Sequence, residues 1–243
     1  MSATLDTLSP KAIARVAGLL YLVIIVCGLG GQGLVREPLV AETAAQTVDN
    51  LLAAETAFRV SILADVAMVL ADVGLGVLLY VLLAPAGRTL SLLAMMMRLA
   101  QAAVLGLNLV HLQQALTLAH APGLEEAARN ALVVSSLDAH AAGYDLGLFF
   151  FAVNCVLVGV LVYRSGLLPR VLGVGLVATG GVYLVGSTLR FVAPALAAPF
   201  AAAYVVPLVA ELALCVWLLA RGVATTTGTP TPGSLPVATA AAG

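Results

Sequence analysis

Six long apolar runs, each close to the length that crosses a bilayer, constrain the fold of this chain more than any other feature. About 20 residues of α-helix span the hydrocarbon core, and backbone amides inside lipid must be satisfied within the segment itself. The sequence therefore predicts an all-α fold, a polytopic transmembrane helix bundle that forms one domain over residues 1–221. The expected spans are about 12–35, 58–84, 89–118, 138–163, 169–189 and 198–221.

The composition supports a membrane protein and excludes other classes. Hydrophobic residues make up 62% of the 243 residues and charged residues only 9%, against about 25% charged in soluble domains. The formal net charge is −1, without the clustered Lys and Arg of a nucleic-acid surface, so membrane lipids are expected partners and nucleic acid is not. The first run exceeds the apolar core of a signal peptide and is expected to stay as a span.

Three segments outside the spans have their own patterns. Residues 41–58 place apolar residues at helical spacing, which predicts a short amphipathic helix lying at the membrane interface. The segment from Pro122 to Leu137 predicts a second interfacial helix. The tail at 222–243 is rich in Thr, Pro, Gly and Ala without periodicity and is expected to be disordered.

The distribution of basic residues predicts the orientation. In a six-span chain both termini share one side, and cytoplasmic loops carry the excess of Lys and Arg. The side with the termini has six basic residues and the opposite side has four, which places the termini in the cytoplasm and both interfacial helices outside. Arg outnumbers Lys ten to one, which is typical of a GC-rich bacterium and suggests a bacterial plasma membrane. The six are Lys11, Arg15, Arg88, Arg164, Arg170 and Arg221; the four are Arg36, Arg59, Arg129 and Arg190.

The stretch LADVAMVLADV over residues 63–73 places two aspartates inside a predicted span. A carboxylate at the bilayer centre costs about 2.5–3.5 kcal/mol on insertion scales, so each needs a partner or a proton. Seven residues rotate a helix by about 700°, which leaves Asp65 and Asp72 within about 20° of each other on one stripe. We expect this stripe to face the interior of the bundle.

Partners for Asp72 follow from the predicted helix hairpin. The turn APAGR at 84–88 makes spans two and three antiparallel, so Asp72 and Arg98 lie at similar depth and are expected to pair. Counted from the inner ends of spans four and six, Asn154 and Glu211 each lie about 15 Å deep, at the same level. Glu211 would compete with Asp72 for Arg98 or be protonated.

A second polar layer is expected nearer the outside. The hairpin count places Asp65 near Asn108 and within about a turn of His111. His140 and Tyr144 share one face of span four, which lets His140 approach His111 at similar depth.

The two layers together suggest a polar cavity that opens outward. Ionisable residues inside a membrane often mark a functional site, because burying them is costly. An Asp–Arg pair and scattered amides can also serve only to hold helices together. The expected lining is Asp65, Arg98, Gln101, Asn108, His111, His140 and Tyr144, with Asp72, Asn154 and Glu211 as the floor.

A metal centre is a weaker hypothesis for the same region. Two histidines and a carboxylate, here His111, His140 and Asp65, match a familiar set of zinc ligands with water in the fourth position. They come from separate spans without a short motif such as HExxH, so no cofactor is predicted and zinc or iron is only possible. No GxSxG elbow, Walker loop or GxGxxG after a strand is present.

Four stretches carry a specific pattern, namely ARVAGLLYLVIIVCG (14–28), ADVAMVLADVGLGVLLYVLLAP (64–85), RLAQAAVLGLN (98–108) and GYDLGLFFFAVNCVLVGVLVYRSGLLPRVLG (143–173). These stretches resemble the bacterial membrane family catalogued as domain of unknown function 4386. The resemblance covers about residues 11–221, with YRSGLLPRVLG as its most specific part. It implies the membrane topology and adds no chemistry.

Three functions stay open at this level. The leading hypothesis is a protein that binds, and transports or senses, a small polar or amphipathic ligand in the outward cavity. The second is a membrane-embedded hydrolase or transferase, with or without a metal ion, that acts on a lipid-like substrate. The third is a structural or accessory membrane subunit.

Overall fold

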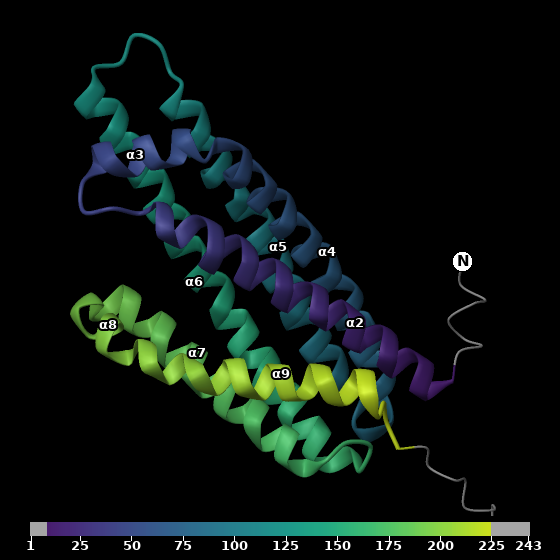
Figure 1. The fold of residues 1–243 in the computed structure, drawn as a ribbon. Coiled ribbons are helices and arrows are strands. Elements are labelled where there is room, and N and C mark those ends of the chain that lie inside the picture. The colour runs from purple at the N-terminus through teal and green to yellow at the C-terminus, as the bar shows by residue number, and fades with distance from the viewer. Residues whose placement is uncertain (1–8, 225–243) are drawn as a thin grey trace, which may run out of the picture.

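The computed structural model describes residues 9–224, and its helices form an elongated bundle (Figure 1). Six helices are long and apolar enough to cross a membrane, as the sequence predicts, and no strand occurs among the described residues. The first span continues beyond α2 as the π-helix η1 (Leu29–Arg36) and the short η2 (Glu37–Leu39). The main helices of the six segments are α2 (Pro10–Gly28), α4 (Glu55–Leu83), α5 (Arg88–Ala119), α6 (Glu126–Ser165), α7 (Arg170–Val192) and α9 (Val205–Ala220). The last segment reaches membrane length because it begins at Pro194, before α9.

Local chemistry explains where these helices begin and end. Ser9 accepts a hydrogen bond from the amide of Ala12, and Pro10 occupies the first turn of α2, where its missing N–H is not needed. Between α4 and α5, the turn η3 (Ala84–Ala86) contains a proline and is followed by glycine. Gly166 ends α6 with φ of +66°, a left-handed conformation that favours glycine.

Of the two short helices predicted outside the spans, one is a separate helix in the structure and the other is not. Helix α3 (Ala44–Ala53) is a separate short helix with Thr43 as its N-cap, as expected. The segment predicted at 122–137 is helical only from Glu126 and is not a separate element, because it forms the first part of α6. No Gly or Pro occurs between Glu126 and Ala142, so this part continues into the fourth span as one helix of 40 residues, or about 60 Å. Residues 225–243 of the predicted disordered tail lie outside the described residues.

Consecutive long helices are neighbours in the bundle. Helices α4 and α5, α5 and α6, and α6 and α7 pack together, α2 packs on α4, and α9 lies against both α2 and α7. Helix α2 begins and α9 ends at the same end of the molecule (Figure 1). Short elements lead from α7 into α9, namely η4 (Pro194–Leu196), α8 (Ala197–Phe200) and η5 (Ala201–Tyr204).

Glycines allow the closest helix contact, between α6 and α7. A Cβ added to Gly173 would lie 2.6 Å from the carbonyl oxygen of Gly159, and one added to Gly180 would lie 2.6 Å from that of Ala152. The glycine-rich fifth span therefore packs closely against its neighbour, as such helices do in membranes.

Candidate functional site

The predicted pair of Asp72 and Arg98 is present at the centre of the bundle. The Arg98 side chain approaches Asp72 Oδ1 through both Nε and Nη2, each at 2.8 Å. Both side chains are only 2% exposed. Removing either partner would leave a buried charge uncompensated, so the pair joins α4 firmly to α5.

Arg98 makes further contacts that fix its orientation. Its Nη1 donates to Asn154 Oδ1 at 3.2 Å, and Asn154 Nδ2 donates to the carbonyl oxygen of Ala94 at 2.7 Å. The guanidinium also lies 5.6 Å from the ring centroid of Tyr21 and 5.1 Å from that of Phe151. Asn154 thus lies at the depth that the sequence predicts, and Arg98 is enclosed on all sides.

Glu211 has hydroxyl partners instead of Arg98. Tyr183 donates to its Oε1 at 2.7 Å and Tyr21 donates to its Oε2 at 3.2 Å. Sequence reasoning missed both tyrosines. The depth count that found Glu211 would also have found Tyr21, which lies about as far into the first span.

Gln101 belongs to the same central cluster as Asp72, Arg98, Asn154 and Glu211. Its Nε2 donates to Asp72 Oδ2 at 3.2 Å, while its Oε1 has no hydrogen-bond partner among the described residues. The side chain is buried, so this oxygen is an unsatisfied acceptor.

Asp65 pairs with a residue that the sequence placed outside the membrane. Arg36 Nη2 lies 2.8 Å from Asp65 Oδ2, and Arg36 also donates to Gln32 Oε1 and Ser61 Oγ, both at 3.1 Å. Asp65 therefore does not depend on Asn108 or His111 for a partner. The reason is that the first span continues as the π-helix η1, which carries Arg36 back over α4.

Asn108 and His140 form their own contact between α5 and α6. Asn108 Nδ2 donates to the backbone carbonyl of His140 at 2.7 Å and lies 3.1 Å from its Nδ1. Glycine at 143 makes this possible, because a Cβ there would overlap the Asn108 side chain. Tyr144 lies next to His140, with ring centroids 6.4 Å apart. The side chain of His111 is half-buried and forms no hydrogen bond or ion pair with the described residues.

Within residues 9–224, no three His, Cys, Asp or Glu side chains converge in a way that could hold a metal ion. The set of His111, His140 and Asp65 lies on three helices, and Asp65 is occupied by Arg36. Zinc or iron at these residues stays an untested hypothesis.

Two cavities lie beside the polar residues. The larger has a volume of about 660 Å³ and lies between α2, α4, α5, α6 and α9. Four predicted residues line it, namely Asp72, Gln101, Tyr144 and Glu211. The other cavity, of about 380 Å³, is lined by His140 and again by Tyr144. The remaining candidates line neither cavity, namely Asp65, Arg98, Asn108, His111 and Asn154.

The family described as Domain of unknown function (DUF4386) matches residues 16–222. The chain belongs to this family. An uncharacterized protein of Archaeoglobus fulgidus is 28% identical to this DUF4386 chain over 124 residues, which is 51% of the chain. The match spans 63% of that relative, less than two thirds of its length. No solved structure matches. Since neither description assigns an activity to DUF4386 proteins, only the geometry of the site can suggest one.

Proposed function

We propose that this DUF4386 protein binds a small amphipathic ligand in the larger cavity, and that it transports or senses this ligand. The observation that carries the proposal is a volume of about 660 Å³ inside a membrane-length bundle, with buried carboxylates in its wall. Pockets for small molecules typically measure about 300–1,000 Å³ and combine apolar walls with a few polar groups.

A purely structural role accounts for only part of the arrangement. The contacts of Arg98 with Asp72 and Asn154 would hold three helices together without any ligand. That role leaves the adjacent volume, with Asp72 and Glu211 in its wall, unexplained.

The residues of the central cluster divide into two roles under this proposal. Asp72, Gln101 and Glu211 line the cavity and are the groups that would contact a ligand. Arg98 lies behind them and positions Asp72, so its contribution is indirect.

A cavity-filling substitution tests the proposal with a closely matched control. Gly33 and Gly30 both lie in η1, and a Cβ added at either position meets nothing within 4 Å, but only Gly33 lines the larger cavity. We expect native mass spectrometry in mild detergent to detect a bound molecule of defined mass on the wild type and on Gly30→Trp. We expect the molecule to be absent from Gly33→Trp.

Two results would contradict the proposal. Equal retention by both tryptophan variants would place the bound molecule elsewhere. Near-stoichiometric zinc or iron that disappears in the His111→Ala/His140→Ala variant would instead favour the membrane-embedded enzyme.

A further inference from the structure

The lining of the larger cavity also points to a class of ligand. We propose that it takes an alkylammonium amphiphile, with a protonated amine head and an apolar tail, which enters from the membrane between α2 and α9. This inference rests on the proposed function, because it names the ligand of the same cavity.

The charges that line the cavity are all of one sign. They belong to Glu37, Asp72 and Glu211, and no Lys, Arg or His is among the lining residues. Asp72 is neutralised by Arg98 from behind, whereas Glu211 has no cationic partner within 4 Å in the described chain. A cationic head is complementary to this wall, and a phosphate head would find no basic side chain there.

The hydrogen-bonding groups at the cavity wall have the same preference. The amide nitrogen of Gln101 donates to Asp72, so it is not a free donor for a ligand. Glu211, held by two tyrosine hydroxyls, offers only carboxylate oxygens. An ammonium group has three N–H donors and no acceptor, so it can bind these oxygens without leaving an acceptor of its own unpaired.

Aromatic rings give the head a second kind of contact. Phe151, Tyr144, Tyr183 and Tyr204 all line the cavity. The ring of Tyr183 lies 5.4 Å from that of Phe151 and 5.9 Å from that of Tyr204, centroid to centroid. Ring faces attract ammonium groups, more strongly where water is excluded.

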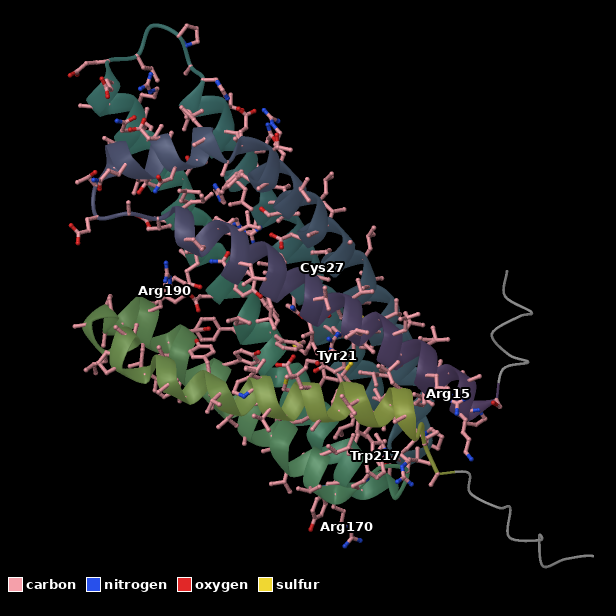
Figure 2. The ribbon with its side chains drawn as sticks, in the orientation of Figure 1. Arg15, Tyr21, Cys27, Arg170, Arg190 and Trp217 are labelled. Carbon is pink, nitrogen blue, oxygen red and sulfur yellow. The ribbon has the colours of Figure 1, made fainter. Side chains whose placement is uncertain are left out.

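The proposed entrance lies between the first span and the start of α9, both of which line the cavity. Helices α2 and α9 meet near Gly18, where an added Cβ would lie 2.9 Å from the amide nitrogen of Leu219. The bond from Tyr21 to Glu211 lies just beyond, and Figure 2 labels Tyr21 where the two ribbons converge. From there the α2 segment and the start of α9 diverge, with α8 well separated from α2 (Figure 1).

On the two edges of this opening, the outward-facing residues next to α2 and on α9 are apolar, whereas Gln32 and Glu37, farther along the first span, are polar. Leu29 on the first span is 53% exposed, and Val205 and Leu208 on α9 are 57% and 42% exposed, yet all three line the cavity. Exposed apolar side chains at this position face lipid tails. An amphiphile in the membrane can therefore insert its head toward Glu211 and leave its tail between these edges.

Radiolabelled dodecylamine, which is protonated at neutral pH, provides the test. The full-length protein is placed in phosphatidylcholine nanodiscs. The dodecylamine that empty nanodiscs take up is measured separately and subtracted. We expect saturable binding near one per chain, with competition by unlabelled dodecylamine but at least tenfold weaker competition by dodecanol or dodecyl phosphate. Glu211→Gln should weaken binding about tenfold or more, and Glu126→Gln, an exposed acid at the start of α6, should not.

The outcomes separate the two proposals. If dodecanol or dodecyl phosphate competes as well as the amine, or if folded Glu211→Gln binds as the wild type does, the alkylammonium inference is overturned while the cavity can still bind another ligand. If Gly33→Trp retains all binding, the cavity itself is not the site. If Glu211→Gln fails to fold, the ranking of the three competitors on the wild type still decides the inference.

Discussion

At the scale of single residues, the buried pair of Asp72 and Arg98 is the most consequential contact in this protein. We expect Arg98→Gln to lower the free energy of unfolding by about 3–5 kcal/mol, because Asp72 is left as an unpaired buried carboxylate. The double variant Asp72→Asn/Arg98→Gln should recover much of this loss, since neither charge then remains. Unfolding in mild detergent would measure both effects.

The partly exposed pair of Arg190 and Asp145 is a natural control. Their side chains are 40% and 14% exposed and lie 3.0 Å apart, Nε to Oδ2. Arg190→Gln should cost less than about 1 kcal/mol, because water screens such a pair. An Arg98→Gln variant no less stable than Arg190→Gln would show that the central pair is not a dominant contact.

At the scale of elements, the contact of α6 with α7 depends on glycine. A Cβ at Gly173 would meet backbone atoms of α6, the oxygen of Gly159 at 2.6 Å and the nitrogen of Tyr163 at 2.8 Å. Because backbone cannot move aside as a side chain can, we expect Gly173→Val to destabilise the bundle by about 1–3 kcal/mol or more. Thermal unfolding in detergent would measure the change.

Gly181 lies on the same helix and serves as the matched control. A Cβ there meets nothing within 4 Å, so Gly181→Val should change stability by about 0.5 kcal/mol or less. Equal destabilisation by both variants would mean that valine in the helix, and not the contact with α6, is responsible.

At the scale of the whole molecule, the predicted orientation can be tested by labelling with a membrane-impermeant maleimide on intact cells. Glu126 at the start of α6 and Thr89 at the start of α5 are both exposed and lie at opposite ends of the bundle. With Cys27 replaced by Ala, we expect Glu126→Cys to react and Thr89→Cys to react only after the cells are opened. The reverse pattern would place the termini outside the cell.

The length of α6 adds a finer expectation. A helix of 40 residues is about twice as long as the hydrocarbon core requires, so its first part should extend beyond the membrane. Leu132, which is 45% exposed, should therefore also be accessible as Leu132→Cys. Protection of this position would show that the start of α6 lies in lipid.

The sequence by itself determined the six spans, because the length of an apolar run and the thickness of a bilayer are both local quantities. It also determined the pairing of Asp72 with Arg98, since the short turn at 84–88 sets the depth of each residue on two adjacent helices. Membership of the DUF4386 family followed from contiguous stretches for the same reason.

Only the tertiary structure decided which distant helices share a polar group. Depth along the membrane normal can be counted from a sequence, but the angular position of one helix around another cannot. For this reason the sequence did not reveal that Asp65 pairs with Arg36 at the end of the first span. It also did not reveal that Glu211 binds Tyr21 and Tyr183, or that Arg98 does not line the cavity. Helix packing determined the unfilled volume beside Glu211, and with it the candidate site.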